Sequence, residues 1–319
     1  MRLQTLISGF ALLLAALALA SCEDGNRPVP LSEVDVAPPL VEPPQSNVNI
    51  SNPTLSVANN FDVSPGDTLT LVWSDEFDGA SLDPQTWFFE TGDGSQYGIP
   101  GWGNNELEYY LPDNAQIVDG KLTITAREER IGAFSYTSAR INTRDRFAVR
   151  YGRIEARMRL PGGQGIWPAF WMLAQDSPYG GWAASGEIDI MEAVNLGGSG
   201  GNLVYGTIHY GGEFPDNLST GQSYLVPSSA QDEFHVYAIE WDSDEIRWYV
   251  DDVMYAMQNN WSSTGGPFPA PFDHPFYIIF NVAVGGDFPG RPEADTIFPV
   301  TMEVDWVRVY SGEPVPAAP

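Results

Sequence analysis

The chain has 319 residues, of which 43% are hydrophobic and 13% aromatic, enough for one large domain with a sizeable core. Its formal net charge is −27, with only 15 Lys and Arg, so a phosphate backbone would be repelled and we expect no nucleic-acid partner. The single cysteine excludes an intrachain disulfide and a cysteine-based zinc site. A neutral polysaccharide is compatible with so acidic a chain.

The N-terminus has the features of an export signal. Met1-Arg2 is a short basic start, and the apolar run from Leu12 to Leu19 is too short for a comfortable membrane span. Leu19-Ala20-Ser21-Cys22 resembles the lipobox of bacterial lipoproteins. The resemblance implies a signal peptide over 1–21, lipidation of Cys22, and a protein exported across the inner membrane and anchored in the periplasm or at the cell surface. An ordinary signal peptide with an incidental cysteine is the alternative.

Residues 22–65 are rich in proline and scattered acids and poor in large apolar side chains. Such a segment buries too little surface to fold, so we expect an extended tether, with a short strand near Asn47–Val57 as the alternative. Residues 66–312 are expected to form one domain, and residues 313–319 a loose tail. We expect a tethered monomer.

The segment from about Thr68 onward reads as an all-β domain. Short alternating runs are separated by turn residues, which predicts two antiparallel sheets packed face to face. The runs cover 69–73, 121–126, 153–160, 234–241, 246–250, 276–284 and 302–310, with hairpin turns at Asp119-Gly120 and Asp251-Asp252. A concave sheet face lined with Trp, Glu and Asp would form a cleft for an extended substrate chain.

Three carboxylates interrupt the apolar run Gly186-Glu187-Ile188-Asp189-Ile190-Met191-Glu192. In a strand, successive side chains point to opposite faces, so Glu187 and Asp189 share a face. Glu192 is three residues after Asp189 and would point to the opposite face. A β-bulge between Asp189 and Glu192 would turn Glu192 to that same face. The Glu backbones would then lie roughly 13 Å apart. With both side chains leaning inward, the carboxyl groups would be roughly 5–6 Å apart, as a retaining glycosidase requires.

The alternative interpretation is structural, because Glu-Ile-Asp-Ile is also the pattern of a half-buried strand with a wet face. Aromatic neighbours favour the catalytic interpretation. Trp167, Trp171 and Trp182 lie just upstream of the carboxylates. Indole rings stack on the C–H faces of sugars while carboxylates accept hydroxyl hydrogen bonds, although some of these rings are expected to be core residues.

Five motifs in order resemble those of the family 16 glycoside hydrolases, in the laminarinase-like form. The active-site strand 186–192 is one of them. The other four are Trp102-Gly103-Asn104-Asn105-Glu106-Leu107-Glu108-Tyr109-Tyr110, Trp167-Pro168-Ala169-Phe170-Trp171-Met172-Leu173, Gly206-Thr207-Ile208-His209-Tyr210 and Asn281-Val282-Ala283-Val284-Gly285-Gly286. The resemblance covers about Trp73 to Tyr310 and is far more specific than any single motif.

The resemblance implies a β-jelly-roll sandwich that hydrolyses internal β-1,3-glucan linkages with retention. Glu187 would be the nucleophile and Glu192 the general acid/base. Asp189 would hydrogen-bond the nucleophile and help keep Glu192 protonated. Crowded carboxylates cannot all ionise cheaply, so one pKa is pushed up. No cofactor is needed for this chemistry.

The resemblance also implies substrate contacts. Trp167 and Trp171 would line the subsites next to the scissile bond, and Trp182, close to them in sequence, is a further candidate for sugar contact. His209 would lie near Glu192, with a structural histidine as its alternative. Three polar residues would contact sugars on the donor side: Asn104, Glu155 and Arg157. For Glu155 and Arg157 a cross-strand ion pair on a wet sheet face is an equal alternative.

A structural calcium ion is a further implication. Many family members hold one on the convex side through backbone carbonyls near Glu76 and Gly120 and through an Asp on the last strand, here Asp305. Hard oxygen ligands suit calcium. An ion-free turn is the alternative.

Other activities fit the same motifs. The mechanism could act on mixed-linkage β-glucan or an algal galactan, although the scarcity of Lys and Arg disfavours sulfated galactans. A transglycosylase would differ only in its affinity for an acceptor sugar. A glycan-binding module without catalysis is disfavoured because all three carboxylates are present.

Overall fold

The computed structural model describes residues 56–58 and 68–313. The chain divides into two units, 1–50 and 51–319, and every described residue belongs to the second. The predicted signal peptide and Cys22 lie outside the described residues. Within the described ranges, no helix has the length and apolar character needed to cross a bilayer.

One sheet of nine strands carries the carboxylate motif. Its main path runs β1 (Ser56–Ala58), β9 (Phe147–Val149), β18 (Phe276–Val284), β11 (Ile166–Ala174), β12 (Glu187–Glu192), β13 (Leu203–Gly211) and β14 (Asn217–Leu225). Two short strands extend it, since β8 (Arg140–Asn142) pairs with β18 and β3 (Phe88–Glu90) pairs with β8. We call it the carboxylate sheet.

The other sheet has ten strands and is called the outer sheet. Its main path runs β17 (Val253–Gln258), β16 (Ile246–Val250), β15 (His235–Trp241), β10 (Gly152–Arg159), β19 (Val300–Glu313), β6 (Lys121–Ile131), β7 (Phe134–Ser138) and β4 (Glu108–Tyr110), with β2 (Thr68–Asp75) on β19 and β5 (Ala115–Val118) on β6. Short 3₁₀ turns connect strands: η1 (Ser95–Tyr97), η2 (Pro100–Gly103), η3 (Pro112–Asn114) and η4 (Trp182–Ser185). The predicted all-β sandwich is confirmed.

Local sequence explains the strand ends. Asp251 and Asp252 have φ values of 49° and 62°, the left-handed pair of a two-residue hairpin turn between β16 and β17. Asp119 and Gly120 have φ values of 51° and 69° and join β5 to β6 in the same way. Both hairpins were predicted. β18 is buried along its whole length, as expected of a central strand with both faces covered.

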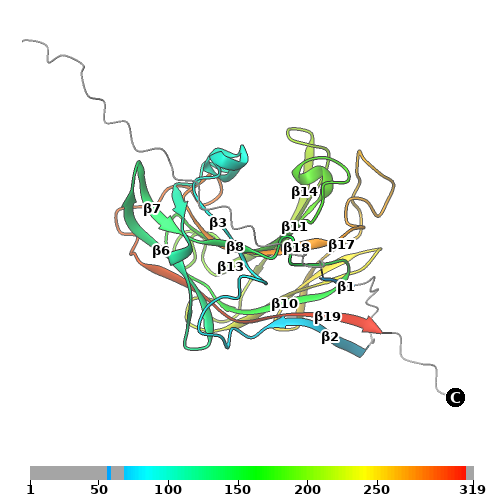
Figure 1. Ribbon diagram of the computed structural model, residues 1–319, viewed down its shortest axis with the longest axis horizontal. Coiled ribbons are helices and arrows are strands. Elements are labelled where there is room, and N and C mark those ends of the chain that lie inside the picture. Colours follow the sequence, from blue (N-terminus) through cyan, green and yellow to red (C-terminus); the bar gives the residue numbers. More distant parts are fainter. Residues whose placement is uncertain (1–55, 59–67, 314–319) are drawn as a thin grey trace, which may run out of the picture. The chain divides into compact units, whose positions relative to one another are not determined.

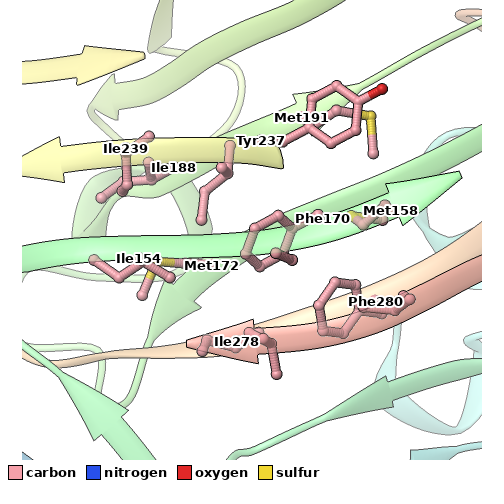
Figure 2. Close-up of a cluster of buried hydrophobic side chains, with 14 of the residues drawn as sticks. Ile154, Met158, Phe170, Met172, Ile188, Met191, Tyr237, Ile239, Ile278 and Phe280 are labelled. Carbon is pink, nitrogen blue, oxygen red and sulfur yellow. The ribbon is translucent and has the colours of Figure 1, made fainter. Parts of the chain in front are cut away.

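The core lies between the two sheets (Figure 2). Ile154 and Met158 of β10 and Ile239 of β15 contribute from the outer sheet, and the carboxylate sheet contributes Phe170, Met172, Ile188, Met191, Ile278 and Phe280. Each such side chain stabilises the fold by about 1.5–3 kcal/mol before entropy is counted. Because Phe170 and Met172 face the core, Trp167 and Trp171 on the other parity of β11 face away from it.

Two predicted boundaries need correction. Ser56–Ala58 falls in the predicted tether but pairs with β9 as a parallel strand. The stretch between Pro53 and Pro65 holds no proline, so its backbone N–H groups are free to join a sheet. Glu313 ends β19 opposite Thr68 and is not part of the tail.

Two connecting segments rise over the carboxylate sheet on the side away from the outer sheet (Figure 1). One carries η1 and η2 and is drawn in cyan, and the other is the hairpin that contains β14, drawn in green. The face of β11 and β12 that turns away from the core, here called the open face, lies on this same side.

Candidate active site

A β-bulge in β12 turns its three carboxylates to the open face. They lie opposite alternate residues of β13: His209, Thr207 and Tyr205 face Glu187, Asp189 and Glu192 in turn. The register therefore slips by one residue between Asp189 and Glu192, as predicted from parity. The two Glu residues face positions four apart on β13, about 13 Å along a strand. The expected carboxyl separation of roughly 5–6 Å stays a prediction.

The bulge is held from the outer sheet. Trp248 Nε1 donates to the backbone oxygen of Asp189 at 2.8 Å, which satisfies a carbonyl at the point where the ladder slips. The Trp248 ring reaches that carbonyl past Gly206 of β13, where a Cβ would lie 2.3 Å from Trp248 Cδ1. Gly206 is therefore required by close packing, which gives the predicted Gly206-Thr207 motif a structural reason.

Glu187 has one hydrogen-bond donor and one nearby histidine. Trp182 Nε1 donates to Glu187 Oε2 at 2.8 Å, and His209 Nε2 lies 3.6 Å from Glu187 Oε1. The same His209 nitrogen lies 3.4 Å from Asp189 Oδ2. His209 therefore links the two carboxylates, and Glu192 is near enough for its charge to act on His209 as well.

His209 is a cation at neutral pH. Burial opposes its charge, but the polar contact with Asp189 and the charge of Glu187 outweigh burial and raise the pKa of His209 to about 10. Glu187, Asp189 and His209 are also the one cluster of potential metal ligands among the described side chains, with ligand atoms all within 4.8 Å. The imidazolium already supplies the positive charge that a metal ion would bring there.

Glu192 has a different environment. Its Oε1 accepts a hydrogen bond from Trp167 Nε1 at 3.0 Å. Burial and the charges of Asp189 and Glu187 raise the pKa of Glu192 well above its usual range. Burial and Asp189 also raise the pKa of Glu187, to about 7, while His209 and Trp182 oppose that rise. Glu187 is therefore the carboxyl that ionises first and Glu192 the one that keeps its proton.

Arg140 of β8 is a site residue that sequence patterns did not single out. Its guanidinium lies 4.6 Å from the ring centroid of Trp102 and 4.7 Å from that of Trp171, between the two indoles. It is also ion-paired with Glu90 of β3. A lone arginine in an ordinary alternating run carries no signal, and only the pairing of β8 with β18 brings it to the open face.

Asn104 lies at the edge of the open face. Its side chain is exposed, and its backbone oxygen accepts a hydrogen bond from the Asp287 N–H at 2.8 Å. A Cβ on the intervening Gly286 would lie 3.0 Å from that oxygen and 3.7 Å from the Trp167 ring. Asn104 is thus brought to the neighbourhood of Trp167, and its contact with donor-side sugars stays a prediction.

Glu155 and Arg157 do not belong to the site, and their predicted place beside donor sugars is wrong. Both lie on β10 of the outer sheet, whose alternate residues Ile154 and Met158 fill the core. Glu155 Oε2 accepts from Arg153 at 2.7 Å, and Arg157 is ion-paired with Asp305 at 2.6 Å. The core separates them from the open face. The cross-strand ion-pair alternative holds for Arg157, which pairs with Asp305 of β19, whereas Glu155 pairs with Arg153 of its own strand.

The residues expected to hold calcium meet at one point of the outer sheet. On β19, Val307 pairs with Asp75 of β2 and Val304 pairs with Leu122 of β6. Asp305 lies between these two positions, where the register of β19 with β10 slips by one residue. Glu76 and Gly120 directly adjoin those two strands. The side chains are engaged elsewhere, because Arg308 binds both Glu76 oxygens and Arg157 holds Asp305.

The fold and the site define a β-sandwich glycoside hydrolase of the two-carboxylate type. The chain belongs to the glycosyl hydrolases family 16, whose model matches residues 102–308. This range includes each residue of the site described above except Glu90.

Named relatives and solved structures agree with this membership. The chain is 43% identical over 289 residues to glucan endo-1,3-beta-glucosidase A1 of Niallia circulans, a match over 82% of this chain but only 42% of that protein. It is 45% identical over 252 residues to a beta-glucanase of Rhodothermus marinus, over 75% of this chain and 84% of that one. The catalytic domain of an endo-1,3-beta-glucanase (laminarinase) from Thermotoga petrophila superposes with a TM-score of 0.70 at 42% identity, covering 78% of this chain and all of that one.

Proposed function

We propose that this protein is a retaining endo-β-1,3-glucanase that cleaves laminarin-type glucans by double displacement. The observation that carries the proposal is the asymmetry of the two glutamates on one bulged strand. Glu187 is paired with a cationic His209, whereas Glu192 is buried beside two other carboxylates and keeps its proton. A retaining mechanism requires one ionised nucleophile and one proton donor.

The two displacements follow from these protonation states. The Glu187 carboxylate attacks the anomeric carbon while Glu192 gives its proton to the glycosidic oxygen, and the leaving sugar departs with that proton. Glu192, now ionised, removes a proton from water, whose oxygen attacks the anomeric carbon and releases Glu187. Both groups return to their starting states, so the cycle needs no cofactor.

His209 and Asp189 set the charge balance of the cycle. The Asp189 charge raises the pKa of Glu192, which keeps the acid protonated before the first step. The His209 cation lies within 3.6 Å of both Glu187 and Asp189 and offsets their repulsion. Trp182 and Trp167 each fix one Glu through an indole N–H, so that the two carboxyls hold their orientation.

The β-1,3 linkage is supported by the relatives. Endo-1,3-β-glucanases are among the similar proteins at 42–43% identity over most of the chain. Product analysis on laminarin, lichenan and agarose, side by side, tests the linkage. We expect internal cleavage of laminarin to be fastest. Faster cleavage of lichenan would indicate a mixed-linkage glucanase, and faster cleavage of agarose would indicate a galactanase. Binding without any product would indicate a glycan-binding module. Transfer products on laminari-oligosaccharides would reveal a transglycosylase.

We further propose a structural calcium ion bound by the backbone oxygens near Glu76 and Gly120 and by Asp305. The convergence of β2, β6 and β19 at Asp305 supports it, and Asp305 would exchange Arg157 for the ion. Chelation with EDTA should then lower the thermal midpoint, and calcium alone should restore it. An unchanged midpoint, or the same response in Asp305→Asn, would contradict the site.

We also propose that the protein is a monomer anchored to a membrane by lipid on Cys22, in the periplasm or at the cell surface. The position of the sole cysteine after an apolar run supports this. Cys22→Ala should move the protein from the membrane fraction to the soluble fraction, and unchanged retention would argue against the anchor. The oligomeric state can be measured by light scattering of the detergent-solubilised protein.

A further inference from the structure

A chain of hydrogen bonds behind the open face connects two of the proposed sugar contacts. Trp171 Nε1 donates to Asn281 Oδ1 at 2.7 Å, and Asn281 Nδ2 donates to the Tyr110 hydroxyl at 3.1 Å. The Tyr110 hydroxyl donates to Glu106 Oε2 at 3.1 Å. From the other end, Asn104 Nδ2 donates to Glu106 Oε1 at 3.0 Å. One buried carboxylate is thus the shared end point of both branches.

The direction of the chain makes Glu106 its anchor. An indole N–H can only donate, which fixes the Asn281 amide with its oxygen toward Trp171 and its nitrogen toward Tyr110. The tyrosine hydroxyl accepts that bond and therefore has its own proton to give to Glu106. Each link is oriented by the one before it, and an ionised carboxylate accepts from both sides without conflict.

Two opposed influences act on the charge of Glu106. Burial, the larger one, raises the pKa of Glu106, while its contacts with Asn104 and Tyr110 and the charge of Arg140 limit that rise. Burial and the charge of Glu106 raise the pKa of its neighbour Glu108 well above the usual range. Tyr110 is fully buried, and both oxygens of Glu106 are engaged by Asn104 and Tyr110.

The two ends of the chain reach the substrate region. Trp171 faces Asp189 across the β11–β12 ladder and lies against Arg140. Asn104 is exposed, beside Gly286 and close to Trp167. A change at Glu106 therefore reaches Trp171 and Asn104, both of which lie near the β12 carboxylates, without touching Glu187 or Glu192.

We propose that Glu106 is a positioning residue for β-glucan binding, which orients Asn104 directly and Trp171 through Tyr110 and Asn281. The inference rests on the proposed function, since it takes laminarin-type sugars as the ligand. It adds a buried carboxylate outside the β12 triplet to the parts of the chain that determine substrate affinity.

Three variants test the proposal. Tyr110→Phe removes only the central hydroxyl, and Glu106→Gln replaces an acceptor by an amide that must direct N–H against either Asn104 or Tyr110. Tyr237→Phe is the matched control, because Tyr237 is equally buried and its hydroxyl has no hydrogen-bond partner among the described residues. Initial rates on laminarin give kcat and KM, and thermal midpoints report folding.

We expect KM to rise about 3- to 10-fold in Glu106→Gln, and less in Tyr110→Phe, with kcat within about twofold of wild type, as for the loss of one or two well-placed hydrogen bonds. Tyr237→Phe should keep the wild-type KM. A purely structural role would lower the midpoint and the active fraction but leave KM unchanged. Wild-type KM in both network variants would overturn the proposal.

A second measurement is independent of turnover. In a Glu192→Gln background, the affinity for laminaritetraose is measured by titration for Asn104→Ala, Tyr110→Phe and the combined variant. Because Asn104 and Tyr110 both donate to Glu106, loss of either bond changes how the other donor is held, so the two losses of affinity should be non-additive. Additive losses, or no loss at all, would contradict the inference. A wild-type protein that binds laminaritetraose without cleaving laminarin would refute the proposed function alone, and one that does not bind it would refute both.

Discussion

Glu187 and Glu192 are the same residue type on the same strand, yet their surroundings give them opposite roles. Glu187 has a cation at 3.6 Å and an indole donor at 2.8 Å, whereas Glu192 has an indole donor at 3.0 Å and two carboxylates that repel its charge. The groups that lie within a few ångströms of each carboxyl therefore determine which Glu attacks and which donates the proton.

Chemical rescue tests these roles. Glu187→Ala should lose activity by roughly 10⁴-fold or more. Azide fits the space left by the carboxylate and should restore turnover of an activated aryl glucoside with inversion, to an α-glycosyl azide. The product anomer is measured by NMR. Glu192→Ala is the control, because azide should give the β-glycosyl azide with that variant. If Glu187→Ala gave the β-azide and Glu192→Ala the α-azide, the roles of the two residues would be exchanged.

The raised pKa of Glu187 also predicts how stability varies with pH. Its pKa is 4.5 in an unfolded chain and about 7 when folded, so folding favours its protonated form. Below pH 4.5 both states are protonated and nothing is lost, whereas above pH 7 the folded state carries a cost of roughly 3 kcal/mol. Glu187→Gln should therefore be more stable than wild type at pH 8, with the difference vanishing near pH 4. Urea unfolding at both pH values measures this, and a variant less stable than wild type at pH 8 would contradict the sign.

At the scale of the strand, the bulge in β12 determines the site. Parity alone predicted it, because a regular strand would have turned Glu192 into the core opposite Glu187. Sequence could not show what holds the bulge in place. The donor is Trp248 of the other sheet, 59 residues further along the chain.

Two buried tryptophans allow a matched test of that support. Trp248→Phe removes the donor to Asp189 O, whereas Trp241→Phe removes a similar volume from a ring whose Nε1 has no partner among the described residues. We expect Trp248→Phe to lose about 1–3 kcal/mol more stability and to lower kcat roughly tenfold or more, since small displacements of reacting groups are costly. Equal kcat values in the two variants would show that the bulge does not depend on Trp248.

The wrong and missed residues have one cause. Alternation in β10 correctly put Glu155 and Arg157 on a face away from the core, but it does not say which sheet the strand joins. Arg140 was missed for the same reason, because its partner Trp171 comes from β11 and only the sheet order brings the two together. Glu106 bonds to Asn104 and Tyr110 within its own segment, but its link to Trp171 runs through Asn281 of β18 and depends on the sheet order as well. The local sequence pattern predicts which face of a strand a side chain points to. Which residues lie next to it depends on the pairing of strands that are distant in the sequence.

At the scale of the whole molecule, the acidic excess dominates the electrostatics. The few arginines of the outer sheet are already engaged: Arg153 contacts Glu155, Glu240 and Asp252, and Arg247 contacts Glu240 and two further acids. The remaining negative charges repel one another, which destabilises the compact state at low ionic strength.

Salt should therefore stabilise the protein. Raising NaCl from about 0.05 M to about 0.5 M shortens the screening length to a few ångströms and weakens this repulsion. We expect the thermal midpoint to rise by several degrees, measured by calorimetry at pH 7.5. Choline chloride serves as the control for specific sodium binding. A midpoint that falls with salt would mean that the arginine ion pairs outweigh the repulsion.

The most direct test of the account is the anomeric form of the first product released from laminarin, followed by ¹H NMR before mutarotation. Double displacement at Glu187 with Glu192 as acid and base predicts that the β-anomer appears first and the α-anomer only later. Initial release of the α-anomer would mean that water attacks directly, and the assignment of Glu187 as nucleophile would be wrong.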